Sequence, residues 1–308
     1  MKTLAIAPVI ALLGLALVLG GCGQPPYNGG GGGGGVAATW TLRHSGSPLW
    51  LQGAAYGGGS FVTVGDSGSV LTSRNGVSWA AQTSNTTHAL YGIAYGNSLF
   101  VAVGHHGTLL TSPDGANWTP RNSGSAEQLR AAAYGDGTYV VVGWNGTVLT
   151  SSDGQSWTIR GSGTSSHLRG IVFGNRTFVA VGNGGTVITS RDGDVWVSQT
   201  SGSSRILWSI AYGGGTFVAV GDGGTVLTSS NGVSWSKQSS GTAKDLHAVA
   251  YGSGTFVAVG ESGTIITSTD GAHWTLQNSG TALNLNGVAY GNGSFTAVGW
   301  NGVILSSP

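Results

Sequence analysis

Residues 168–206 read LRGIVFGNRTFVAVGNGGTVITSRDGDVWVSQTSGSSRI. Four runs rich in β-branched and aromatic residues are separated here by clusters of Gly, Asn and Asp, which is typical of short strands joined by turns. The runs are LRGIVF at 168–173, TFVAV at 177–181, TVITS at 186–190 and VWVSQ at 195–199. None of them repeats apolar residues at helical spacing, so we predict four strands, A to D.

This unit recurs along the chain with a constant period. Trp196 is one of seven tryptophans that are each 39 residues apart, and a leucine follows each of them after 11 residues. A fixed period of this size is typical of repeat architectures, and four-stranded units of about 40 residues form the blades of β-propellers. The repeating tryptophans are Trp40, Trp79, Trp118, Trp157, Trp196, Trp235 and Trp274.

The two ends of the repeat region complement each other. Residues 36–308 span seven periods; the last unit stops at Pro308, after its third strand, and an unpaired run precedes the first full unit. We therefore predict an all-β, seven-bladed β-propeller of four-stranded antiparallel blades. The N-terminal strand should complete the last blade, so that the closed ring has no exposed edge.

The first residues resemble the signal of a bacterial lipoprotein. A basic start at Lys2 and an apolar run from Leu4 to Leu19 precede Leu19-Gly20-Gly21-Cys22, and the run is shorter than the ~20 residues of a membrane span. The resemblance implies cleavage before Cys22 and a diacylglyceryl group on its sulfur. We expect a signal peptide at 1–21, the lipidated cysteine with a flexible glycine-rich tether at 22–35, and the propeller at 36–308.

The implied location is the cell envelope, with a lipid anchor in the outer membrane or at the cell surface. Gly23 follows the cysteine instead of Asp, so the sorting rule of lipoproteins does not hold the protein at the inner membrane. The formal net charge is only +1. The protein therefore lacks the excess of positive charge that is typical of general nucleic-acid binders. We expect no nucleic-acid partner.

The turn between strands C and D carries the motif Ser-x-Asp-Gly-x-x-Trp. The Asp can accept hydrogen bonds from its own turn, and Gly accepts a positive φ. The motif occurs at Ser112–Trp118, Ser151–Trp157, Ser190–Trp196 and Ser268–Trp274, and with Asn for Asp at Ser73–Trp79 and Ser229–Trp235. It resembles the Asp-box (BNR) repeat of sialidases and of photosystem II stability/assembly factor propellers, with one residue fewer between Asp and Trp. The resemblance covers residues 36–308 and implies a structural role for the Asp.

Two segments vary between units, namely the D–A loop with the start of strand A, and the two-residue B–C turn. Because neighbouring strands run antiparallel, both segments emerge on the same face of the ring, which we call the variable face. All four tryptophans outside the repeating positions lie in these segments, and so do five of the seven histidines. These residues are Trp50, Trp144, Trp208, Trp300, His88, His105, His106, His167 and His247.

Exposed aromatic clusters rimmed by polar groups usually bind ligands, so we predict a binding site on the variable face. The residue after each repeating leucine should enter the innermost strand at the mouth of the central channel. The predicted ligand-binding residues are Trp50, Gln52, Tyr91, His105, Arg130, Trp144, Arg169, Trp208, His247, Asn286 and Trp300.

These residue types suit stacking combined with hydrogen bonding, as in the recognition of sugars or peptide segments. We predict a non-enzymatic recognition module, monomeric and without cofactor, that binds a protein or a carbohydrate. The resemblance to assembly factors implies a protein partner, because those propellers carry an arginine patch near the channel. Arg130 and Arg169 occupy adjacent blades there in this chain.

Two other functions follow from the same face. A sialidase-like glycoside hydrolase is the main alternative, with Asp222 and Glu261 as a possible carboxylate pair. The three arginines of a sialidase site would then be Arg130, Arg169 and Arg205, and the nucleophile would be Tyr91. Sialidases, however, have six blades, whereas this chain has seven repeats. A metal site formed by His247, Asp222 and Glu261 is a third hypothesis, and we assign no metal ligand or catalytic residue.

Overall fold

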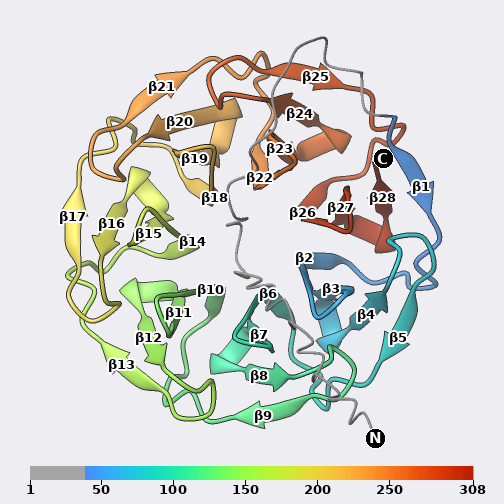
Figure 1. Cartoon of the computed structure of the whole chain (residues 1–308), viewed down its shortest axis with the longest axis horizontal. Helices are drawn as coiled ribbons and strands as arrows, with labels where there is room; N and C mark the ends of the chain where they lie inside the picture. The colour runs from blue at the N-terminus through green and yellow to red at the C-terminus, as the bar shows by residue number, and fades with distance from the viewer. Residues whose placement is uncertain (1–38, 308) are drawn as a thin grey trace, which may run out of the picture.

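The computed structural model describes residues 39–307 and confirms the seven-bladed β-propeller. Seven four-stranded antiparallel sheets stand in a ring (Figure 1). The proposed signal peptide, the lipidation site at Cys22 and the tether at 22–35 lie outside the described residues. Within residues 39–307, no helix is long and apolar enough to cross a bilayer.

Each blade has the strand order A-B-C-D from the channel outward. The A strands are β2 (Leu51–Gly57), β6 (Leu90–Gly96), β10 (Leu129–Gly135), β14 (Leu168–Gly174), β18 (Leu207–Gly213), β22 (Leu246–Gly252) and β26 (Leu285–Gly291). The B strands are β3 (Ser60–Gly65), β7 (Leu99–Gly104), β11 (Thr138–Gly143), β15 (Thr177–Gly182), β19 (Thr216–Gly221), β23 (Thr255–Gly260) and β27 (Ser294–Gly299). We number the blades 1 to 7 in this order.

The C and D strands are shorter. The C strands are β4 (Val70–Ser73), β8 (Leu109–Ser112), β12 (Val148–Ser151), β16 (Val187–Ser190), β20 (Thr225–Ser229), β24 (Ile265–Ser268) and β28 (Ile304–Ser306). The D strands are β5 (Ala80–Gln82), β9 (Thr119–Arg121), β13 (Thr158–Arg160), β17 (Val197–Gln199), β21 (Ser236–Gln238), β25 (Thr275–Gln277) and, in blade 7, β1 (Thr41–Arg43).

A short 3-10 turn joins each B strand to its C strand. These turns are η1 (Asp66–Gly68), η2 (His105–Gly107), η3 (Trp144–Gly146), η4 (Asn183–Gly185), η5 (Asp222–Gly224), η6 (Glu261–Gly263) and η7 (Trp300–Gly302). The predicted two-residue B–C turn therefore includes a third residue, a glycine that is buried in every blade.

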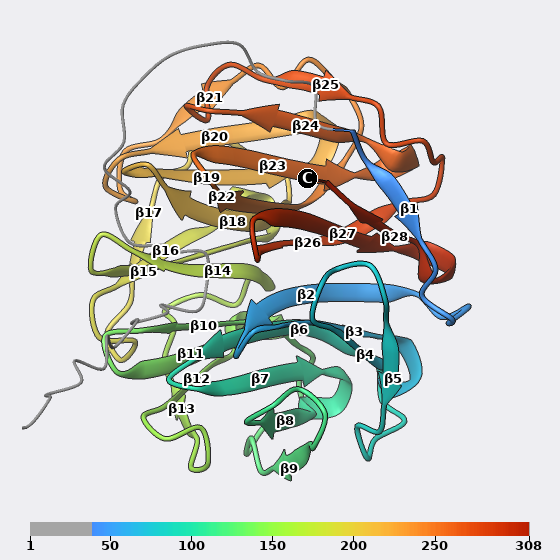
Figure 2. The ribbon, with the colours of Figure 1, turned by 45° about the vertical axis from the view of Figure 1, so that its right-hand side comes forward.

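The N-terminal strand completes the last blade, as predicted. Strand β1 pairs with β28, with Thr41 opposite Ser306 and Arg43 opposite Ile304, and the two strands lie side by side in both ribbon views (Figures 1 and 2). Arg43 Nε donates a hydrogen bond of 2.7 Å to Ser306 Oγ. Residues from both ends of the described chain thus form one sheet, and the ring is closed.

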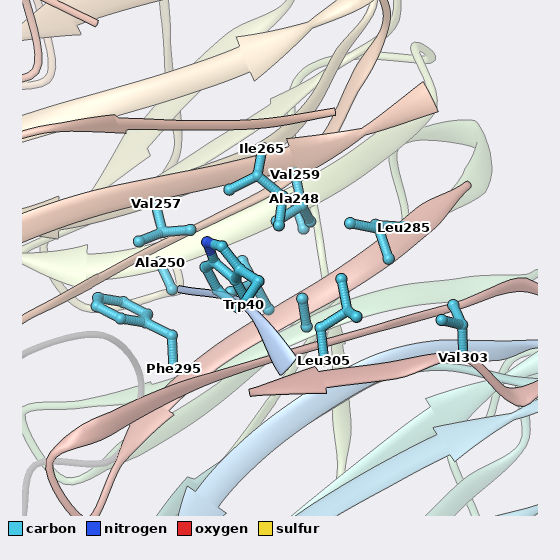
Figure 3. Close-up of a cluster of buried hydrophobic side chains, with 12 residues drawn as sticks. Trp40, Ala248, Ala250, Val257, Val259, Ile265, Leu285, Phe295, Val303 and Leu305 are labelled. Carbon is cyan, nitrogen blue, oxygen red and sulfur yellow. The ribbon is translucent and has the colours of Figure 1, made fainter. Parts of the chain in front are cut away.

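The hydrophobic core lies between adjacent blades. Trp40 is buried between blades 6 and 7, against Val257 of β23 and against Phe295 and Leu305 of β27 and β28 (Figure 3). The B strands are buried along almost their whole length, which explains why their sequences lack the alternation of a half-exposed strand. Each sheet therefore depends on its two neighbours for burial.

The C–D turn has the structural role that its motif predicts. In blade 2, Asp114 Oδ1 accepts hydrogen bonds from the N–H groups of Ala116 and Asn117 at 2.9 and 2.8 Å, and Trp118 Nε1 donates to Gly115 O at 2.8 Å. Asn75 accepts the equivalent bonds in blade 1. Residues that form these turn bonds are not part of the D strand, which therefore begins after the Trp of the motif.

The D strand of blade 4 begins two residues later than predicted, at Val197 instead of 195. The N–H of Val195 donates to Asp192 Oδ1 at 3.1 Å, and the indole N–H of Trp196 donates to Gly193 O at 2.8 Å. Both residues therefore belong to the turn.

Candidate functional site at the channel mouth

Every A strand begins with a β-bulge at the variable face. In blade 3, Leu129 lies opposite Gly143 and Ala131 lies opposite Val142, so Arg130 is the extra residue of the bulge. An extra residue leaves the strand ladder, and its side chain is re-aimed. The seven bulge residues are Gln52, Tyr91, Arg130, Arg169, Trp208, His247 and Asn286.

Hydrogen bonds hold each B–C turn beside the bulge of its own blade. In blade 3 the N–H of Trp144 donates to Gln128 O at 2.9 Å, and equivalent bonds occur in the other six blades. Gly143 allows this close approach, because a Cβ atom there would lie 2.3 Å from the same carbonyl oxygen. The first residue of each turn therefore lies near the bulge residue 14 positions before it.

A cavity of about 810 Å³ occupies the channel. Eight of the eleven predicted ligand-binding residues line it, including all seven bulge residues and Trp300. Trp50, His105 and Trp144 do not line it, although they lie on the same face. The structure thus brings most of the predicted residues around one cavity and leaves three of them beside it.

Among residues 39–307, two arginines are the only formally charged residues that line this cavity. The guanidinium carbon of Arg130 lies 4.3 Å from the ring centroid of Tyr91, and that of Arg169 lies 4.0 Å from the ring centroid of Trp208. Each cation is therefore stacked on an aromatic ring from a neighbouring blade. Arg169 Nε also donates to Asn183 Oδ1 at 2.5 Å.

Burial and mutual repulsion act on the two guanidinium groups. The pKa of Arg130 is lowered to about 10, mainly by burial and also by the charge of Arg169, while Tyr91 opposes the shift. Burial also lowers the pKa of Arg169, and the carboxylate of Asp222 opposes that shift. Both arginines remain charged at neutral pH, so the cavity presents two adjacent positive charges.

Polar groups on the rest of the mouth are held by hydrogen bonds. Gln52 Nε2 donates to Asp66 Oδ1 at 3.0 Å, and Asn286 Nδ2 donates to Leu51 O at 3.0 Å. His247 Nδ1 donates to Leu285 O at 3.0 Å, which leaves Nε2 as the acceptor of the neutral ring. These bonds fix the side chains before any ligand arrives.

The extra tryptophans are less exposed than predicted. Only Trp50 is exposed, at 39%, whereas Trp144, Trp208 and Trp300 are half-buried. Trp50 stacks on Trp300 with centroids 4.3 Å apart, and Trp144 stacks on His167 with centroids 4.7 Å apart. Each stack joins a B–C turn to the start of the next blade, so part of each ring is used in contacts between blades.

The site also has an apolar part, which was not predicted from the sequence. Below the mouth, the cavity is lined in every blade by a small or branched apolar residue three positions after the repeating leucine. The constant spacing could have revealed this layer. The residues are Ala54, Ile93, Ala132, Ile171, Ile210, Val249 and Val288. Asn284 and Ser209 also line the cavity and were not predicted.

The carboxylates proposed for hydrolysis do not line the cavity. Asp222 Oδ1 accepts a hydrogen bond of 2.5 Å from Trp208 Nε1, and Glu261 lies 3.8 Å from the ammonium group of Lys244. In the part of the chain that the structure describes, no group of three His, Cys, Asp or Glu residues is placed to hold a metal ion. Each of the two carboxylates is therefore held by another side chain outside the cavity, and the described residues do not form the proposed metal site.

The comparisons with known proteins agree with the fold. The family described as "DUF6242 beta propeller domain" matches residues 164–282, fewer than half of the 308 residues. No curated protein matches the chain.

Several solved structures have the same architecture. YCF48 from Cyanidioschyzon merolae is similar with a TM-score of 0.69 and 17% identity, over 87% of this chain and 98% of that one. YCF48 bound to D1 peptide is similar with a TM-score of 0.71 and 16% identity, over 93% and 97%. The WD40 β-propeller domain of Doa1 has a TM-score of 0.69 and 14% identity, over 88% and 97%. At these identities the similarity establishes the fold alone.

Proposed function

We propose that this protein is a non-enzymatic recognition module whose channel mouth binds an acidic segment of a protein partner. The observation that carries the proposal is the charge of the cavity: of the residues that the structure describes, Arg130 and Arg169 line it side by side and no carboxylate does. Buried charges are costly unless they are paired. A carboxylate of the ligand could accept two parallel hydrogen bonds from one guanidinium group. Such charge-assisted, bidentate pairs are among the strong hydrogen bonds of proteins.

Other features of the mouth favour a peptide over a neutral sugar. The stacked rings of Tyr91 and Trp208 orient the two guanidinium groups, while the apolar layer below them offers contacts to side chains. Tyr, Trp and Arg are the residue types most enriched at the centres of protein interfaces. A structurally similar propeller, YCF48, has been solved bound to D1 peptide, which is consistent with a peptide ligand.

Binding of a fluorescent oligo-aspartate peptide, measured by anisotropy, tests the proposal. We expect wild-type protein to bind it and the Arg130→Gln/Arg169→Gln variant to lose most of the affinity. The matched control removes two arginines elsewhere, Arg160 and Arg176, and should bind normally. Equal binding by both double variants, or no binding by the wild type, would contradict the proposal. If the protein instead binds a neutral glycan, and this binding requires the same two arginines, the ligand is a carbohydrate and not a protein segment.

The proposal includes attachment to the cell envelope through Cys22. This part rests on the sequence of residues 1–22. In a bacterial host that lipidates proteins, the wild type should be recovered with the membrane fraction, whereas Cys22→Ala should not carry the lipid. Equal membrane recovery of both proteins would contradict the anchor and leave the binding proposal unaffected.

A further inference from the structure

Three histidines of blade 2 gather on the variable face, outside the cavity. His88 lies in the D–A loop before β6, and His105 and His106 begin η2. The ring centroids of His105 and His106 are 3.9 Å apart, and His88 lies 6.1 Å from the first and 5.6 Å from the second. His88 and His106 are exposed and His105 is half-buried. We call these three residues the histidine cluster.

Hydrogen bonds define the state of His88. The hydroxyl of Thr108 donates to His105 O at 2.6 Å, so its hydrogen is already used. His88 Nδ1, which lies 2.8 Å from the same hydroxyl oxygen, must therefore be the donor. The lone pair of the neutral ring is then on Nε2. Protonation of Nε2 adds a positive charge to the surface without breaking this bond.

None of the ion pairs among the described residues involves the cluster. The pKa of His105 is lowered by burial first, and then by repulsion from His106 and His88. The ionisable residues on the adjoining segments are Asp66 of η1, Tyr91 of β6, and Glu127 and Arg130 at the start of blade 3. Among residues 39–307, the ion pairs join Arg160 to Asp194, Lys244 to Glu261 and His273 to Asp270, so none of them involves the cluster.

The cluster adjoins the arginine side of the channel mouth. The N–H of Gly107, the last residue of η2, donates to Glu127 O at 2.8 Å, three residues before Arg130. The N–H of His105 donates to Ala89 O at 2.9 Å, two residues before Tyr91, the residue on which Arg130 stacks. The histidines therefore occupy the rim beside this cation–π pair.

We propose that the histidine cluster is an acid-dependent anion-binding surface that extends the channel mouth. At neutral pH an acidic segment is held by Arg130 and Arg169. Below about pH 6 the cluster gains positive charge, since unperturbed histidine titrates near 6.5, and it attracts further carboxylates of the same segment. The inference rests on the proposed function and adds its regulation by pH.

The size of the effect follows from Coulomb's law. One added charge about 6 Å from a carboxylate, in surroundings close to water, tightens binding by about threefold. Because the three rings repel one another's charges, full protonation of all of them is opposed. We therefore expect a gain of about three- to tenfold on acidification, and this gain should shrink as salt screens the charges.

The test is the affinity for a fluorescent oligo-aspartate peptide at about pH 7.5 and about pH 5.5, values on either side of the ordinary histidine pKa; aspartate stays ionised at both. Wild-type protein should bind more tightly at the lower pH. The variant His88→Gln/His106→Gln removes the two exposed rings; it should bind as the wild type does at the higher pH and lose most of the gain. His273→Gln, on the opposite face, is the matched control and should keep the gain.

The outcomes separate this inference from the proposed function. If wild-type protein binds equally at both pH values, or if the double variant keeps the full gain through other histidines such as His167 and His247, the cluster is not the sensor and only this inference fails. If the wild type does not bind the peptide at either pH, the proposed function fails and the inference fails with it. Circular dichroism and melting of each variant show whether the propeller is intact.

Discussion

The guanidinium group of Arg169 lies 4.0 Å from the ring centroid of Trp208, which belongs to the next blade. The same indole donates its N–H to Asp222 at 2.5 Å. Trp208 therefore has two effects on the cavity: it orients a cation, and it engages a carboxylate that could otherwise move toward that cation. Neither effect requires Trp208 to touch a ligand.

This relationship predicts a graded response to substitution of Trp208. Trp208→Leu removes the cation–π contact and releases Asp222, so binding of an oligo-aspartate peptide should weaken by about five- to thirtyfold, equivalent to the ~1–2 kcal/mol of a desolvated contact. Trp208→Phe keeps a ring under Arg169 but still releases Asp222, and should weaken binding less. Calorimetric titration measures both. Full affinity in Trp208→Leu would show that Arg169 needs no aromatic support.

Closure of the ring predicts the cost of altering the N-terminal strand. Trp40 is buried between blades 6 and 7 in contact with residues from both. Trp40→Ala should lower the free energy of unfolding by about 3–5 kcal/mol, as for other large core truncations. Leu42→Ala is the control, because Leu42 is 65% exposed and its truncation should cost less than about 0.5 kcal/mol. Urea denaturation that gave the two variants equal stability would contradict closure by β1.

Removal of the Tyr139 hydroxyl, which has no equivalent in the other blades, should lower stability slightly. The side chain of Tyr139 donates a hydrogen bond of 2.5 Å to Gly96 O in the preceding blade, and the equivalent residue in the other six blades is Phe. Burial raises the pKa of Tyr139, so the hydroxyl stays protonated. Tyr139→Phe should cost about 1 kcal/mol in thermal or urea unfolding, the net value of one hydrogen bond. A more stable variant would mean that this hydroxyl is strained.

The C–D turns predict how stability changes in acid. Hydrogen bonds, of which the N–H of Asn117 gives the largest, lower the pKa of Asp114 to about 2, and similar bonds lower the pKa values of Asp153, Asp192 and Asp270. Because each folded pKa is below the unfolded value of about 3.9, the stabilisation is complete above about pH 4 and is lost as the pH falls toward 2.

Replacing these four aspartates by Asn should therefore flatten the acid limb of the stability curve. Asn75 and Asn231 already accept the same turn hydrogen bonds in blades 1 and 5, so the substitution preserves the turn. The urea midpoint of the wild type should fall between about pH 7 and about pH 3 by more than that of the variant. Parallel curves for the two proteins would exclude these carboxylates as the source of acid sensitivity.

The sequence predicted the ring, the blade boundaries and the face on which the variable residues gather, because these depend on a repeat that is constant over seven units. It could not show that Arg130 is the extra residue of a bulge, since a bulge is defined by the register between Leu129 and Gly143. The partners of the tryptophans were also missed. Trp144 and His167 are 23 residues apart, and Trp300 and Trp50 have the same separation around the closed ring, so the spacing itself carried the signal.

The most direct test of the central claim is to map where an acidic peptide lies on the propeller. An oligo-aspartate peptide with a photo-activated benzophenone group would be cross-linked to the protein, and the adducts located by mass spectrometry. We expect adducts on the A strands and B–C turns of blades 2 to 5, around Arg130 and Arg169, and their loss in the Arg130→Gln/Arg169→Gln variant. Adducts confined to the C–D turns or to the outer D strands would contradict it.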